Sequence, residues 1–141
     1  MDADKEQIAE VLIRYATGID FKDWPLLRTC WTDDVEVDYG EVGRYSGVDA
    51  ITDLMVQLHN GMGPTYHRLS NLAITVDGDR AMARSYVFAH LQAVRDDASS
   101  WVEALGHYED EFVLTPQGWR IAKRSAHIAR VQSGVTPAQQ S

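Results

Sequence analysis

Hydrophobic residues near the start of the chain recur at steps of three and four positions. Over about residues 4–19 they fall on one stripe, which predicts an amphipathic helix with Tyr15 on its buried side. Residues 23–25 then offer a capping aspartate and a proline suited to a first helical turn, so a short second helix is predicted there, with Trp24 at its start. Asp20 falls at the junction between these two helices.

A third stretch with helical spacing follows Ser46. This hydroxyl with a carboxylate three residues later matches a capping box, and the apolar positions after it include Met55 and Leu58. The helix is expected to end near residues 61–64. His59 lies close to that end, where a positive charge is favoured, and is therefore predicted to be a surface residue.

In the rest of the chain the hydrophobic period changes to two, as in half-buried strands. A first alternating run at residues 35–39 points Tyr39 inward, and longer runs predict strands at about 66–76, 80–95, 101–114 and 119–130. Helices followed by an antiparallel meander predict an α+β fold, in which a curved sheet wraps over three N-terminal helices. We expect one domain, with an ordered core at about residues 4–130 and a polar tail at 131–141.

Alternation also indicates which polar side chains of the strands face the core. On strand 101–114 the even positions are mostly apolar, which places Tyr108 and Asp110 inside and leaves His107 outside with the glutamates. On strand 119–130, His127 is expected to face inward and Arg124 outward.

The other two long strands are less clear. On strand 80–95 the even positions are bulky, so Phe88 and His90 are expected to line a concave wall. Strand 66–76 has similar residues on both faces, and its pattern does not orient His67. The resulting prediction is a long, mostly apolar pocket whose wall includes Tyr15, Trp24, Met55, Leu58, Phe88, Tyr108 and Asp110.

Charge and cysteine content narrow the choice of partners. The chain of 141 residues has a formal net charge of −8, which opposes binding to nucleic acid phosphates. Cys30 is the only cysteine, so an intrachain disulfide or a CxxC pair cannot form. The acidic N-terminus does not resemble a signal peptide, and no apolar run approaches the ~20 residues that span a bilayer. A cytoplasmic protein without a nucleic acid or membrane partner is expected.

Several short motifs, taken in order, carry a resemblance to a known family. They are YATGIDFKDW at residues 15–24, DVEVDY at 34–39, YHRLSN at 66–71, GHYED at 106–110 and GWRI at 118–121. Together they resemble the SnoaL-like branch of the nuclear transport factor 2-like (NTF2-like) superfamily, which is similar in sequence style to scytalone dehydratase and a bile acid dehydratase. The resemblance covers nearly the whole chain and implies a cone-shaped α+β fold around one pocket.

The resemblance also implies an acid/base pair. In such relatives an aspartate after the first helix orients a histidine at the start of a long strand, and Asp20 and His67 match these positions. Tyrosines of the dehydratases match Tyr15 and Tyr39. His90, Asp110 and His127 fall near further pocket positions, although His90 and His127 replace other residue types there, so the polar contacts of a substrate do not carry over.

This residue set suits proton abstraction. A neutral imidazole takes up a proton near neutral pH, and a carboxylate on its other nitrogen fixes the tautomer. Phenols can hydrogen-bond a developing enolate or a leaving hydroxide. The expected function is a cofactor-free lyase or isomerase acting on a small apolar hydroxy-ketone, polyketide or steroid-like compound. A non-catalytic binding or assembly module of the same superfamily is the alternative.

Metal and partner expectations complete the prediction. The inward histidines lack the spacing of helical metal motifs, so no metal and no cofactor are expected at the site. The open outer face of the sheet is expected to pair in a homodimer.

Overall fold

Three helices and a six-stranded sheet make up the protein in the computed structural model, which describes residues 2–94 and 96–136. The helices are α1 (Asp2–Asp20), α2 (Trp24–Arg28) and α3 (Val48–His59), with a 3-10 turn η1 at Gly40–Val42. The strands are β1 (Trp31–Asp38), β2 (Arg44–Ser46), β3 (Thr65–Asp77), β4 (Arg80–Val94), β5 (Asp97–Thr115) and β6 (Gly118–Val135). The predicted α+β class is confirmed.

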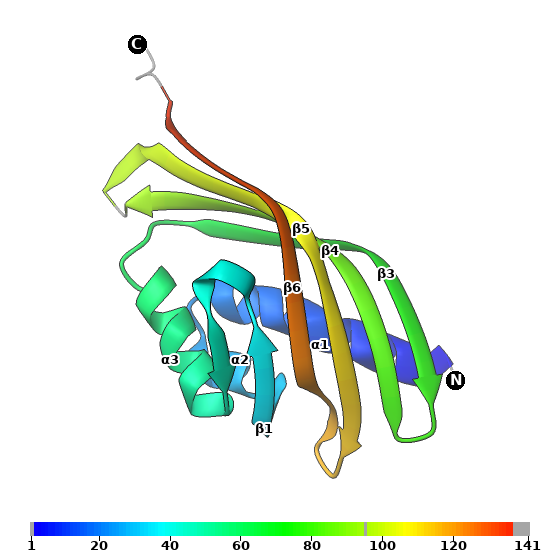
Figure 1. The fold of residues 1–141 in the computed structure, drawn as a ribbon. Coiled ribbons are helices and arrows are strands. Elements are labelled where there is room, and N and C mark those ends of the chain that lie inside the picture. Colours follow the sequence, from blue (N-terminus) through cyan, green and yellow to red (C-terminus); the bar gives the residue numbers. More distant parts are fainter. Residues whose placement is uncertain (1, 95, 137–141) are drawn as a thin grey trace.

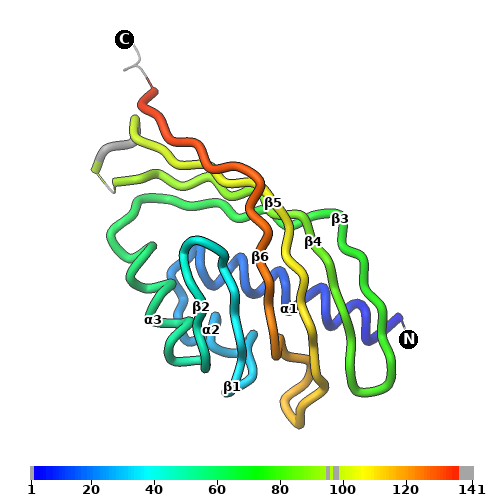
Figure 2. The backbone as a smooth tube through the Cα atoms, in the orientation of Figure 1, coloured from blue at the N-terminus to red at the C-terminus, as the bar shows by residue number. Residues whose placement is uncertain are grey.

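The long strands curve over the helices. The strand order is β2-β1-β6-β5-β4-β3, antiparallel throughout except that β1 runs parallel to β6. Figure 1 shows α1 lying beneath the concave face of the sheet, with α2 and α3 closing one end. Figure 2 shows how the backbones of β4, β5 and β6 bend over that helix. Among the described residues, no helix is long and apolar enough to cross a membrane.

The core lies between α1 and the concave face of the sheet. The stripe predicted from helical spacing is buried, and aromatic and aliphatic residues of β1, β5 and β6 pack against it. Its fully buried members include Ile8, Leu12, Tyr15, Ile19, Trp31, Phe112 and Ile121. Burial of this apolar surface is the main force that seats α1 on the sheet.

Both predicted helix starts can be compared with the structure. Asp23 caps α2 as expected, since its side chain accepts a hydrogen bond from the backbone N–H of Leu26 at 3.1 Å. The capping box at Ser46 is wrong. Ser46 belongs to β2 and donates its hydroxyl to Glu36, and Gly47 occupies the N-cap of α3 with a φ of 92° that favours glycine.

The chain end and the strand faces bring three corrections. Strand β6 continues to Val135, past the expected end of the ordered core at residue 130, whereas residues 137–141 of the expected tail lie outside the described residues. On β4 the small odd positions are buried and the bulky even ones are not, so Phe88 and His90 lie on the outer face.

The third correction concerns β6, where a β-bulge reverses the alternation. Phe112 pairs with Ile121, but Glu111 pairs with Lys123, so Ala122 is an extra residue. Beyond it Arg124 points into the core and His127 points outward, the opposite of the prediction. A one-residue slip exchanges the faces of every later side chain until the next irregularity.

Candidate active site

A cavity of about 150 Å³ lies between α1, α3 and the concave face of the sheet. Its wall is mostly apolar and includes Val42, Met55, Leu58, Val87, Leu91 and Ile128. Its polar lining consists of three tyrosines and two histidines: Tyr15, Tyr39, Tyr108, His59 and His67. Larger hollows exist on the surface, but this cavity is where buried ionisable side chains converge, so it is the candidate site.

His67 is held in one orientation by Asp20. Its Nδ1 lies 2.7 Å from Asp20 Oδ1, and its backbone N–H donates to Asp20 Oδ2 at 2.8 Å. Thr65 also donates its hydroxyl to Asp20, at 2.9 Å. A carboxylate oxygen can only accept, so in the neutral ring the proton sits on Nδ1 and Nε2 keeps its lone pair, in a ring that lines the cavity.

The dyad joins the end of one helix to the start of a strand. Asp20 is the last residue of α1, and His67 is the third residue of β3. Both side chains are well shielded, with 7% of the His67 side chain and 15% of the Asp20 side chain exposed. The contact between carboxylate and imidazole is therefore shielded from water, which strengthens their electrostatic interaction.

A second histidine, His59, lines the same cavity. It ends α3 and is buried, so the prediction of a surface residue is wrong. Its Nδ1 lies 2.9 Å from the carbonyl oxygen of Met55, which fixes the Nδ1–H tautomer, and its ring centroid lies 5.6 Å from that of His67. Burial lowers the pKa of His59 to about 4, so the ring is neutral at physiological pH and offers an acceptor nitrogen.

Three phenols form a hydrogen-bonded cluster at one end of the cavity. The hydroxyl of Tyr15 lies 3.0 Å from that of Tyr39 and 3.3 Å from that of Tyr108. Burial raises the pKa of Tyr15 and that of Tyr108 well above the ordinary value, so both hydroxyls are protonated donors. Three O–H groups share two mutual hydrogen bonds, which leaves one O–H for a ligand.

Arg124 supports this cluster from below. Its guanidinium carbon lies 4.1 Å from the centroid of the Tyr15 ring and 3.9 Å from that of Tyr108, and its Nη1 donates to the Tyr39 hydroxyl at 3.5 Å. Since Arg124 can only donate, it polarises the chain of hydroxyls toward the cavity. A positive charge beneath three phenols suits the binding of an oxygen that becomes negative.

Asp110 forms an ion pair with Arg124 on the side away from the tyrosine hydroxyls. The two side chains are fully buried and form two hydrogen bonds, at 2.7 Å from Nε and 3.0 Å from Nη2. Burial raises the pKa of Asp110, and the attraction of Arg124 opposes that rise. The bidentate geometry keeps the pair ionised, and Asp110 fixes the guanidinium under the tyrosines.

The structure brings together only part of the predicted set. Asp20, His67, Tyr15, Tyr39, Met55, Leu58 and Tyr108 are at the cavity or in direct contact with a residue that lines it. Asp110 stands one layer behind, and Trp24 packs against the core instead of the cavity.

Three predicted pocket residues lie on the outer face of the sheet. His90 pairs with Glu103 there at 2.6 Å, and Phe88 lies under the guanidinium of Arg68. His127 pairs with Glu109 at 3.3 Å. The physical reason is the alternation of side chains along each strand: the even positions of β4 point outward, and the bulge at Ala122 turns His127 outward on β6.

Among the ionisable residues of the site, sequence reasoning missed His59 and Arg124. The burial of His59 could have been inferred from its spacing of four residues after Met55 on the apolar stripe of α3. Arg124 had no such signal, because the bulge at Ala122 is not visible in the alternation.

Comparison with known proteins identifies the family. A model of the SnoaL-like domain matches residues 3–125, and the chain belongs to this family. The uncharacterized protein Rv2910c of Mycobacterium tuberculosis is 32% identical over 123 residues, which cover 86% of this chain and 83% of that protein. The resemblance inferred from the motifs is thus confirmed.

Solved structures share the fold. A scytalone dehydratase-like protein from Novosphingobium aromaticivorans superposes with a TM-score of 0.84 at 20% identity, covering 99% of this chain and 95% of that one. A hexachlorocyclohexane dehydrochlorinase (LinA) of type 2 superposes with a TM-score of 0.83 at 20% identity, covering 97% and 94%. These superpositions show that the fold is shared. Because the identities are only 20%, the chemistry has to be argued from the residues of this chain.

Proposed function

We propose that this protein is a cofactor-free lyase or isomerase in which His67 is the general base and Asp20 orients it. The observation that carries the proposal is the 2.7 Å contact between His67 Nδ1 and Asp20 Oδ1 beside an apolar cavity. A carboxylate on Nδ1 leaves Nε2 as the basic nitrogen and stabilises the imidazolium that forms when it takes up a proton.

The reaction begins with proton abstraction from a carbon next to a carbonyl group. Nε2 of His67 removes this proton, and the electron pair moves onto the carbonyl oxygen as an enolate. The free O–H of the tyrosine cluster donates to that oxygen, with the charge of Arg124 behind it. This arrangement binds the enolate more strongly than the starting ketone, which is what lowers the barrier.

Two outcomes are open to the enolate. In a dehydratase the enolate collapses, a carbon–carbon double bond forms and the bond to a β-hydroxyl breaks; the His67 imidazolium returns its proton to this hydroxyl, which leaves as water. In an isomerase the proton returns to a different carbon and the double bond migrates. Both outcomes regenerate the neutral imidazole and require no metal or redox group.

The cavity favours a compact substrate. A volume of about 150 Å³ fits a single six-membered ring better than four fused rings. His59 presents an acceptor nitrogen, so the substrate should carry a hydroxyl group that donates to it. The best candidate within the expected classes is therefore a one-ring hydroxy-ketone.

A proton-exchange assay tests the proposal without knowledge of the natural substrate. One-ring β-hydroxy-ketones are incubated with the protein in D₂O; NMR follows deuterium uptake at the carbon next to the carbonyl, and ultraviolet absorbance follows formation of the enone. His67→Ala and Asp20→Asn should each reduce both rates by roughly 10²–10⁴-fold. Because the two residues act as one unit, the double variant should be little worse than the worse single one.

The outer face supplies a matched control. His90 also binds a carboxylate through Nδ1, at 2.6 Å from Glu103, but away from the cavity, so His90→Ala should leave both rates unchanged. If His67→Ala exchanges deuterium as fast as the unmodified protein while its ligand affinity falls, the protein is a binding module and the catalytic proposal is wrong.

A further inference from the structure

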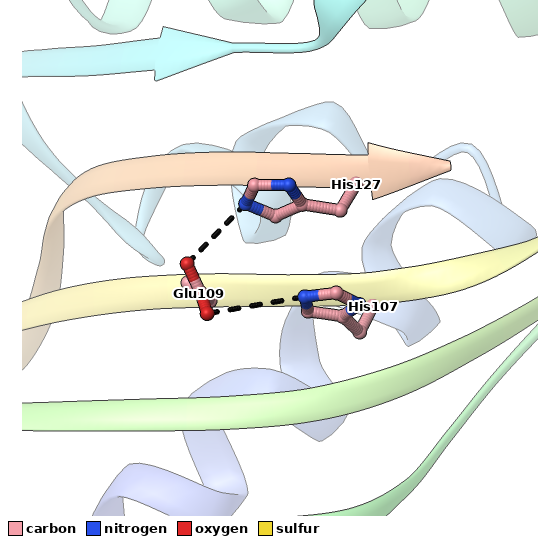
Figure 3. A group of neighbouring side chains, drawn as sticks. All are labelled: His107, Glu109 and His127. Carbon is pink, nitrogen blue, oxygen red and sulfur yellow. Dashed lines mark ion pairs between the residues drawn. The ribbon is translucent and has the colours of Figure 1, made fainter. Parts of the chain in front are cut away.

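The outer face of the sheet carries a second group of ionisable side chains, remote from the cavity. His107 and Glu109 lie on β5, and His127 lies directly opposite His107 on β6. Figure 3 shows the carboxylate of Glu109 beside the two imidazole rings, with an ion pair drawn to each of them. His127 joins this group only because the bulge at Ala122 turns it outward.

The three side chains already face one another at distances close to those of a metal site. Oε2 of Glu109 lies 3.3 Å from His127 Nε2, and Oε1 lies 3.9 Å from His107 Nε2. Donor atoms of the three residues all lie within 4.8 Å of one another. A tetrahedral ion with bonds of ~2.0–2.2 Å separates its ligand atoms by roughly 3.3 Å, so small rotations of these partly exposed side chains suffice.

The backbone beneath the cluster is built for close approach. A side chain at Gly106 would collide with the backbone carbonyl of His127, so β5 and β6 can approach there only with glycine at that position. The rings of His107 and His127 stack with centroids 4.7 Å apart and planes 11° apart. The strand register therefore fixes the backbone positions of His107 and His127, and only side-chain torsions have to change for the rings to bind one ion.

We propose that His107, Glu109 and His127 bind one Zn²⁺-like divalent ion on the outer face of the sheet. Two imidazole nitrogens and one carboxylate suit Zn²⁺ and its transition-metal neighbours, whereas Mg²⁺ and Ca²⁺ prefer oxygen ligands. Three protein ligands leave the fourth tetrahedral position for water. All three ligands belong to one chain, so the site does not require a second copy.

Bound there, the ion ties β5 to β6 directly behind the residues that support the cavity. Tyr108 follows His107, and Arg124 lies three residues before His127, both on the inner face. The net charge of −8 favours a cation, although Arg84 lies opposite Glu109 on β4 and its charge opposes one locally. Arg84→Gln should for that reason tighten metal binding.

Titration of the untagged, chelator-treated chain with ZnCl₂ in a calorimeter tests the site, at a pH of about 8 where free imidazole is neutral. One Zn²⁺ per chain should bind, and His127→Ala and Glu109→Gln should each weaken binding by more than ~10-fold. His90→Ala removes an equivalent outer-face histidine that pairs with Glu103 and should change nothing. Co²⁺ should give the visible absorption of a tetrahedral ion in the unmodified chain, and excess Mg²⁺ should not displace it.

Three results would overturn the proposal. The first is an absence of saturable binding below millimolar Zn²⁺. The second is equal affinity in the unmodified chain, His127→Ala and Glu109→Gln, because the ion would then sit elsewhere. The third is one ion per two chains, which would mean that the ligands come from two copies. Thermal unfolding of each metal-free variant shows whether a lost affinity reflects a lost fold.

Discussion

Removing the buried guanidinium of Arg124 should destabilise the protein severely. Arg124 and Asp110 are both 0% exposed and share two hydrogen bonds at 2.7 and 3.0 Å. In Arg124→Met the Asp110 carboxylate stays buried without its partner, which costs about 3–5 kcal/mol in comparable pairs. At roughly 3 °C per kcal/mol for a chain of this length, the melting temperature should fall by about 10–15 °C.

Urea unfolding of matched variants measures the free energy directly. Lys123→Met is the control, since this neighbouring cation is exposed and its loss should cost less than about 0.5 kcal/mol. Adding Asp110→Asn to Arg124→Met removes the stranded charge and should recover at least about half of the loss. Without Arg124 the pKa of Asp110 rises further, so the folded state holds a proton more tightly and the deficit should shrink as the pH falls.

The same experiment can refute the reasoning. If Arg124→Met and Lys123→Met cost the same, Arg124 is not buried in solution and the bulge at Ala122 is absent. If the double variant is less stable than Arg124→Met alone, the loss comes from packing of the guanidinium between the tyrosine rings rather than from the stranded carboxylate.

The two remaining predictions concern pH and assembly. Burial lowers the pKa of His59 to about 4, below that of the unfolded chain, so stability is lost as the pH falls from about 6.5 toward 4. The free energy of unfolding, measured with urea at pH 7 and at pH 5, should fall by about 2 kcal/mol less in His59→Gln than in the unmodified protein. Equal decreases in the two proteins would contradict this. We also propose that the outer face pairs in a homodimer, because it exposes 49% of Tyr86 and 40% of Leu105. Sedimentation should show a dimer at micromolar concentration that Tyr86→Glu dissociates, and a monomeric unmodified protein would refute the pairing.

The elements of the fold could be read from periodicity because the signals are long. The apolar stripe of α1 extends over about three turns, from Ile8 to Ile19, and each of the last four strands is more than ten residues long. Local errors average out over such lengths. The prediction for the start of α3 was wrong because serine is a common N-cap residue. In the structure the backbone of Ser46 belongs to β2, and its hydroxyl donates a hydrogen bond to Glu36.

The orientation of site residues was harder to predict, because irregularities in the strands break the alternation. One lies in β3 near Asn71, whose φ is 52°, and two affect the pairing of β5 with β6. The bulge near Asn71 moves the inward positions from odd numbers at Leu69 to even ones at Ile74, which is why the pattern of β3 did not orient His67. Its placement beside Asp20 followed from the family resemblance and not from the local sequence.

The error on β4 has a different origin, and it supports the proposed dimer. Large residues were expected inward because burial of large apolar side chains is favourable. The concave face of a strongly curved sheet has less room per residue, however, and Tyr108 from β5 and Arg124 from β6 fill it, so β4 presents Ala83, Val87 and Ala89 there. The bulky side chains of β4 lie on the convex face, where exposure of their apolar surface to water is unfavourable. A second molecule covering that face would give them the burial that their own chain does not provide.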